Sequence, residues 1–191
     1  MKILICGDSF AADWTVKYPN RKGWVNMLAD QHDVTNLAQA GCSEYKIYLQ
    51  LLSQNLTAYD KIIICHTSPN RIYVKEHPHH KDDKLHKNSD LIYSDLKYRD
   101  KHDPLVAYFE TCFDLEYFNF IHTLICEKID SLTKPFQILH VTNIYWDDLY
   151  KFPNSQDFAK VFEKHRGDTN HFDDQGNLLV YGKIIDWLLE K

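Results

Sequence analysis

The stretch Lys2-Ile3-Leu4-Ile5-Cys6-Gly7-Asp8-Ser9 opens the chain and indicates its fold. A short apolar run rich in β-branched residues is typical of a strand that is buried on both faces of a parallel sheet. Gly-Asp-Ser then ends the run abruptly. Besides this first strand, Lys2 to Cys6, three further runs have the same character: Asp33 to Leu37, Lys61 to Cys65 and Phe136 to Val141.

Helical patterns separate the predicted strands. Apolar residues recur at spacings of three and four in four segments: Trp24 to Ala29, Tyr45 to Leu56, about Leu105 to Leu132, and Leu178 to Leu189. The alternation predicts an α/β protein with three layers, α/β/α, around a mostly parallel, flavodoxin-like central sheet. Functional groups in such folds gather at the carboxyl ends of the strands.

The chain of 191 residues fits one domain, 1–191, with a sizeable core. One polar stretch, from about 72 to 104, interrupts the alternation. A connection of this length in a compact domain is usually either functional or disordered. We interpret it as an insertion that forms a solvated flap over the site or a surface for another chain.

Histidines within this insertion raise the question of a metal. His77, His79, His80 and His86 lie close together, and imidazole is a common zinc ligand. However, no cysteine accompanies them, and interleaved lysines would repel a cation. The sequence therefore predicts no metal and no cofactor.

Charge and cysteine content narrow the class of protein. The formal net charge of −5 argues against a nucleic-acid partner, because phosphate binding needs a basic surface. The first apolar run is too short for a signal peptide, and no run reaches membrane-spanning length. Five cysteines without C-x-x-C spacing suggest neither a disulfide framework nor a zinc site. We expect a cytoplasmic protein with no membrane partner, and the oligomeric state stays open.

A candidate nucleophile follows the first strand. Ser9 would lie at the mouth of the sheet with its hydroxyl exposed, and its own amide could point at an oxyanion. The alternative is that Asp8 and Ser9 only turn the chain or cap a helix.

A second candidate motif precedes the last predicted helix, in Gly167-Asp168-Thr169-Asn170-His171-Phe172. A serine hydroxyl needs a base to remove its proton and a carboxylate to orient that base. His171 and Asp168 supply both if their loop folds over the strand ends. The alternative is that Asp168 or Asp173 caps the following helix and His171 is an exposed loop residue.

Together, these motifs and the α/β pattern between them resemble the SGNH (GDSL-like) hydrolase family, over nearly the whole chain. The resemblance implies that Ser9 is the nucleophile and that Asp168 and His171 complete a catalytic triad. The run Asn36 to Gly41 is similar to the second family block, which implies that the amide of Gly41 joins that of Ser9 in an oxyanion hole.

The third family block is where the sequence departs from the resemblance. The family has Gly-x-Asn-Asp after the third strand, whereas this chain has Cys65-His66-Thr67-Ser68-Pro69-Asn70-Arg71. Ser68 aligns with the oxyanion asparagine, and Asn70 is the nearest amide; we favour Asn70 and keep Ser68 open. Arg71 could bind a substrate carboxylate or phosphate, or pair with an acidic side chain.

The resemblance implies a serine esterase or acyl hydrolase that works through an acyl-enzyme. Its substrate would be a small-molecule or carbohydrate ester, with a small acyl group on a carbohydrate as our preference. Three alternatives remain: a non-catalytic glycan- or protein-binding domain of the same fold, an acyltransferase, and a flavodoxin-like flavin or phosphate binder.

Overall fold

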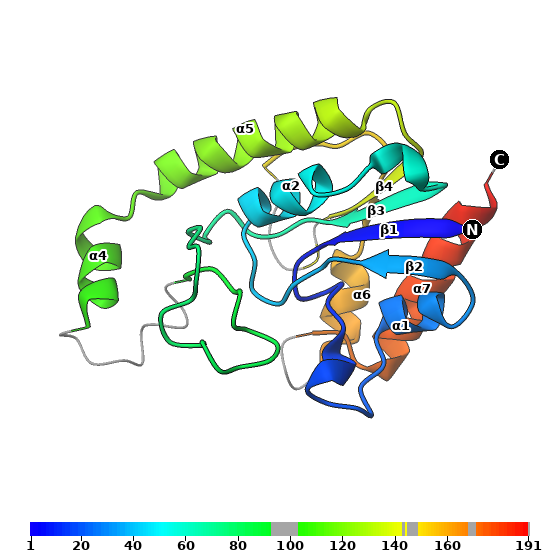
Figure 1. The fold of residues 1–191 in the computed structure, drawn as a ribbon, viewed down its shortest axis with the longest axis horizontal. Helices are drawn as coiled ribbons and strands as arrows, with labels where there is room; N and C mark the ends of the chain where they lie inside the picture. Colours follow the sequence, from blue (N-terminus) through cyan, green and yellow to red (C-terminus); the bar gives the residue numbers. More distant parts are fainter. Residues whose placement is uncertain (93–102, 143, 145–148, 168–170, 191) are drawn as a thin grey trace.

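A five-stranded parallel sheet forms the centre of the molecule (Figure 1). The structure is a computed structural model that describes residues 1–92, 103–142, 144, 149–167 and 171–190. Every strand pair of the sheet is parallel, in the order β2-β1-β3-β4-β5. The strands are β1 (Lys2–Gly7), β2 (Asp33–Asn36), β3 (Lys61–Cys65), β4 (Ile138–Thr142) and β5 (Ser155–Asp157). The predicted α/β class and parallel central sheet are confirmed.

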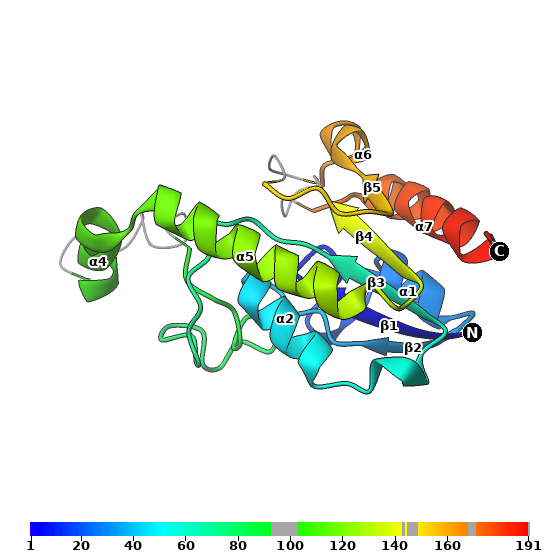
Figure 2. The same cartoon turned by 90° about the horizontal axis from the view of Figure 1, so that it is seen from above.

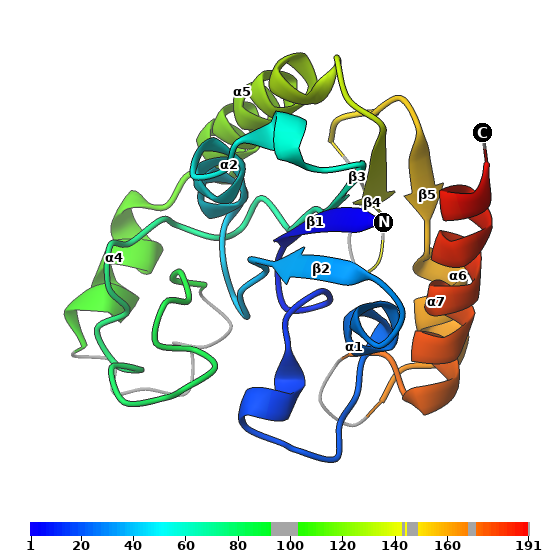
Figure 3. The ribbon, with the colours of Figure 1, turned by 45° about the vertical axis from the view of Figure 1, so that its right-hand side comes forward.

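Helices cover both faces of this sheet, which confirms the three layers (Figures 2 and 3). One layer holds α2 (Glu44–Leu52) and α5 (Leu115–Thr133), and the other holds α1 (Trp24–Ala29), α6 (Ala159–Lys164) and α7 (Asp174–Leu189). Side chains of β1 alternate between the layers: Ile3 and Ile5 pack with α1 and α7, and Leu4 and Cys6 pack with α2 and α5. Burial on both faces explains the continuous apolar run of β1.

The predicted long helix from about Leu105 to Leu132 is two helices, α4 (Pro104–Cys112) and α5. Phe113 is extended, and the Asp114 carboxylate caps α5 by accepting hydrogen bonds from its first amides. Figures 1 and 2 show α4 at the end of the molecule away from the two termini. Within the described ranges, no helix has both the length and the apolar character needed to cross a membrane.

Other boundaries also differ from the predicted ones. Helix α2 ends at Leu52 and is followed by the short helix η2 (Leu56–Ala58). Helix α7 begins at Asp174, before the predicted Leu178, because the Asp173 carboxylate caps it by accepting the Gly176 amide (2.7 Å). The edge strand β5 and the helix α6 were not predicted, since neither carries a clear apolar pattern.

The described part of the insertion packs against the rest of the domain. Ile72 and Leu91 form an antiparallel bridge that closes it. Leu85 is buried against Ala12, Ala40 and Trp14, the last of which belongs to the short helix η1 (Trp14–Val16). Lys17 forms an ion pair with Asp83 (2.6 Å). The insertion therefore borders the chain that follows Ser9.

Candidate active site

A tight turn at the end of β1 positions Ser9. The Asp8 amide donates to the Cys65 carbonyl, and the Asp8 carboxylate accepts the Phe10 amide (2.9 Å). Strands β1 and β3 come so close here that a Cβ at Gly7 would lie 2.7 Å from the Cβ of Cys65. Only glycine fits such an approach. The turn places Ser9 at the carboxyl edge of the sheet, where the residue is buried, with 8% of its surface exposed, whereas the sequence predicted an exposed residue.

Aromatic side chains hold His171 beside this turn. The His171 ring lies 4.9 Å from the Phe10 ring and 4.4 Å from the Trp14 ring, centroid to centroid. Trp14 also binds the turn directly, because its Nε1 donates to the Ser9 carbonyl oxygen (2.8 Å). One indole thus contacts both the predicted nucleophile and the predicted base.

Backbone contacts join the two ends of the loop that carries His171. The Gly167 amide donates to the His171 carbonyl (2.6 Å), and Arg166 and Phe172 form an antiparallel bridge. His171 is half-buried, so it is not the exposed loop residue of the alternative interpretation. Asp173 does cap the following helix, as that interpretation allowed. Asp168, the predicted carboxylate of the triad, lies outside the described residues.

Ser9 and His171 line the same cavity, of about 430 Å³. This is the size range of small-ligand sites. Its lining combines aromatic and apolar side chains with charged ones, and it comes from the β1 turn, helix α1, the His171 loop and helix α7. The charged and amide residues of the lining are Arg21, Lys22, Arg166, Asp173, Asp174 and Asn177.

Gly41, the second predicted oxyanion donor, lies in a loop that runs against β1. The Gln39 amide and the Cys42 thiol both donate to the Gly7 carbonyl. Gly41 has φ +74°, and a Cβ there would lie 2.6 Å from the Cβ of Ser89 in the insertion. The loop after β2 is therefore packed between the Ser9 turn and the insertion, and it requires glycine at position 41.

Arg71, in the segment that follows β3, contacts the same loop. Its Nη1 donates to the Gly41 carbonyl (3.2 Å), and its Nε donates to the Thr67 hydroxyl (3.2 Å). The charge of Arg71 also faces Asp8. These contacts give Arg71 a structural role at the carboxyl ends of β1 and β3. Its charge next to Asp8 corresponds to the second alternative from the sequence, in which Arg71 pairs with an acidic side chain.

Ser68 and Asn70 do not join the cavity of Ser9 and His171. Ser68 is buried and lines a second cavity, of about 530 Å³, between α2 and α5. Asn70 is exposed in a turn, where its amide donates to the Ser68 hydroxyl (3.2 Å). Neither candidate for the third oxyanion donor therefore lines the cavity that Ser9 and His171 share.

Asp8 is the most buried acid near the predicted nucleophile, with 1% of its surface exposed. Burial raises the pKa of its carboxyl from 3.8 to about 6. The charge of Arg71 and hydrogen bonds from the Phe10 amide and the Thr67 hydroxyl oppose this rise. Asp8 thus acts as an acceptor that shapes the turn and ties β1 to the end of β3.

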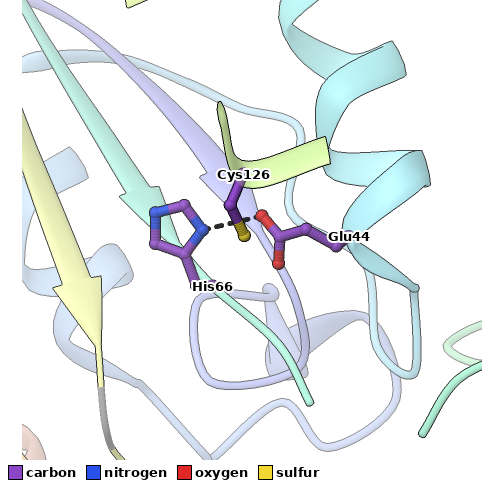
Figure 4. Close-up of side chains that lie close together, drawn as sticks. All are labelled: Glu44, His66 and Cys126. Carbon is purple, nitrogen blue, oxygen red and sulfur yellow. Dashed lines mark hydrogen bonds and ion pairs between the residues drawn. The ribbon is translucent and has the colours of Figure 1, made fainter. Parts of the chain in front are cut away.

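Sequence reasoning missed a buried polar cluster of Glu44, His66 and Cys126 (Figure 4), and Glu44 of this cluster also lines the second cavity. His66 Nδ1 lies 2.7 Å from Glu44 Oε1, and Cys126 lies beside this pair. On the other side, His66 Nε2 lies 2.9 Å from His140 Nδ1. His66 directly follows a predicted strand, and this position was the signal that could have found the cluster.

The chain as a whole matches no family model and no curated protein.

Proposed function

We infer that the protein is a serine esterase or acyl hydrolase of the SGNH type. One observation carries the proposal: Ser9 and His171, from motifs near opposite ends of the sequence, line one cavity at the carboxyl edge of the sheet. Active sites of open parallel sheets lie at this edge. The short turn of Ser9 and the ring contacts of His171 support preorganised chemistry there.

In the proposed mechanism, His171 accepts the proton of the Ser9 hydroxyl, whose oxygen attacks the acyl carbonyl carbon. The Ser9 amide stabilises the oxyanion. The Gly41 amide enters this scheme from the family resemblance alone, because Gly41 does not line the cavity of Ser9 and His171. The alcohol leaves with the proton from His171. In the second half of the reaction, His171 accepts a proton from water, and the water oxygen attacks the acyl carbonyl carbon. The Ser9 oxygen then leaves with the proton from His171, and the acid is released. Asp168 enters this scheme from the sequence motif alone, as the carboxylate that orients His171.

The cavity lining supports a small, polar ester as the substrate. Its volume of about 430 Å³ suits a small molecule, and Trp14 offers an aromatic surface of the kind that sugars stack on. Arg21, Lys22 and Arg166 add positive charge. A small acyl group on a carbohydrate fits this mixture better than a long acyl chain would.

Hydrolysis of p-nitrophenyl acetate by the Ser9→Ala variant tests the proposal. We expect a loss of about 10³-fold or more, because no other group replaces the nucleophile. Ser68→Ala is the matched control, since Ser68 also lies at the carboxyl edge of the sheet but lines the other cavity. Intact activity in Ser9→Ala, or an equal loss in Ser68→Ala, would remove the proposal.

A second candidate function is ligand binding without catalysis. It is favoured by the position of Ser68 and Asn70 outside the Ser9 cavity, because the site then lacks the usual third oxyanion donor. Loss of one such donor costs about 10²–10³ in rate. Wild-type protein that hydrolyses no activated ester but binds acetylated sugars would establish this function instead.

We also propose a reducing compartment, the cytoplasm. Cys6, Cys42 and Cys65 are buried thiols within the core around β1 and β3, and they pack as small apolar side chains. Thiol titration of protein purified without reductant tests this point, and five reactive thiols in the denatured chain are the expected result.

A further inference from the structure

The buried cluster on the α2 and α5 face joins three kinds of metal-binding side chain. Glu44 is the first residue of α2, His66 follows β3, and Cys126 lies within α5. One ligand atom from each lies within 4.8 Å of the others, and Figure 4 shows these atoms converging. All three residues are buried, so little water competes for them.

The spacing of these atoms is close to that of a tetrahedral zinc site. Zinc bonds of about 2.0 to 2.3 Å place neighbouring ligand atoms roughly 3.3 to 3.8 Å apart. The atoms of this cluster reach that spacing if His66 Nδ1 and Glu44 Oε1, now 2.7 Å apart, separate by about 0.6 Å. The Cys126 sulfur, which lies within 4.8 Å of both atoms, moves toward them by up to about 1 Å.

The groups around the cluster hold its ligands in place. The second oxygen of Glu44 accepts the Thr67 amide (3.1 Å). His66 Nε2 faces His140 Nδ1, so a His66 that binds metal through Nδ1 donates its remaining proton to His140. A partner on the far nitrogen is the usual arrangement for a histidine that binds a metal.

A fourth position and an entry path lie on the same side. His122 precedes Cys126 by one helical turn, so both face the same way from α5. Glu44 and His122 line the second cavity, of about 530 Å³. A metal ion entering through this cavity would find its fourth ligand in a cavity water or, after a side-chain movement, in His122, which is not among the three residues whose ligand atoms converge.

We propose that Glu44, His66 and Cys126 bind a divalent transition-metal ion, with Zn²⁺ as the best match to the donor set of one carboxylate, one imidazole and one thiolate. Binding requires that the Cys126 thiol release its proton and that Nδ1 of His66 carry none. The proposal does not depend on the activity of Ser9, which lies in the other cavity. It departs from the prediction, drawn from the sequence, that the protein binds no metal.

Titration of the full-length, chelator-treated protein with Co²⁺ tests the proposal. We expect one Co²⁺ per chain, a thiolate-to-cobalt charge-transfer band, and loss of that band when Zn²⁺ displaces the cobalt. Wild-type protein that shows no such band overturns the proposal without recourse to any variant. In that case the cluster is a buried hydrogen-bonded group and no more.

Variants then locate the site. Cys126→Ser should abolish the band and weaken Co²⁺ binding at least 100-fold, and Glu44→Gln should weaken it at least 10-fold. Cys112→Ser and His80→Gln are matched controls, since Cys112 is the exposed cysteine and His80 belongs to the insertion. A band that survives in Cys126→Ser, or that disappears in either control, contradicts the assignment.

Discussion

The carboxyl edge of one sheet carries two polar clusters that differ in kind. The first, Ser9 with His171, opens into a cavity bordered by α1 and α7. The second, Glu44 with His66 and Cys126, is buried between the sheet, α2 and α5. The first suits a group that must reach a substrate, and the second suits a group that must be held away from water. The same topology thus presents different chemistry on its two faces.

The two clusters also differ in how visible they are in the sequence. Ser9 and His171 each stand in a short motif at a strand end or before a helix, so a pattern could find them. Glu44, His66 and Cys126 are single residues of three elements, and only the packing of α2 against α5 assembles them.

The largest effect is expected for His171→Ala. Loss of the base should reduce ester hydrolysis by about 10³-fold, or about 4 kcal/mol in transition-state stabilisation. Steady-state kcat/KM measures it. His32→Ala is the control, because His32 lies at the opposite, amino-terminal end of β2 and should leave the rate within about twofold. Equal effects of the two substitutions would show that His171 has no special role.

Gly41→Ala should be the most destabilising change in the loops around Ser9. The left-handed φ of +74° and the 2.6 Å approach to Ser89 both oppose a Cβ, at a cost of about 3 kcal/mol in the free energy of unfolding. Urea denaturation measures this cost.

Gly182→Ala is the matched control for this change, since a Cβ there meets nothing within 4 Å in helix α7. It should raise stability by about 0.5 to 1 kcal/mol. A Gly41→Ala protein as stable as the wild type would contradict the packing of the insertion on this loop.

Asp8 links the two clusters, because Thr67 donates its hydroxyl to Asp8 and its amide to Glu44. Burial raises the pKa of Asp8 to about 6, so the folded protein binds this proton more tightly than the unfolded chain does. Stability should therefore fall as the pH rises from about 4 to 6, by roughly 2 to 3 kcal/mol.

The Asp8→Asn variant should lack this part of the pH dependence. Urea denaturation of both proteins at pH 4 and pH 7 gives the comparison. Parallel pH profiles for the two proteins would mean that Asp8 is ionised at its ordinary pKa in the fold.

The smallest effect is expected for Trp14→Phe. Phenylalanine keeps an aromatic surface against His171 but loses the Nε1 hydrogen bond to the Ser9 carbonyl. A looser turn should reduce kcat about 10-fold, equal to about 1.4 kcal/mol, with little change in KM. Trp187→Phe, in helix α7, serves as the control and should keep the wild-type kcat.

Much of the fold follows from the sequence because a doubly buried strand is a continuous apolar run. Lys2–Gly7 and Lys61–Cys65 are the clearest cases. The edge strand Ser155–Asp157 was missed because it pairs on one side only and carries polar residues. The break at Phe113 was missed because apolar spacing continues across it, while the cap at Asp114 decides where α5 begins.

The sequence indicates candidate site residues only where local sequence determines position. Ser9 and His171 line one cavity because Ser9 follows β1 and His171 precedes α7, and the topology fixes where these two elements lie. Ser68 and Asn70 were placed by alignment to a family block, and the turn at Pro69 sends one into the second cavity and the other to the surface. Side-chain direction within such a turn is not encoded in a residue pattern.

Reaction with a fluorophosphonate probe, followed by peptide mass spectrometry, examines the nucleophile most directly. We expect one covalent adduct per chain, on Ser9, in wild-type protein, and none in Ser9→Ala. An adduct on another serine, or the absence of any adduct on folded wild-type protein, would mean that Ser9 is not an activated nucleophile.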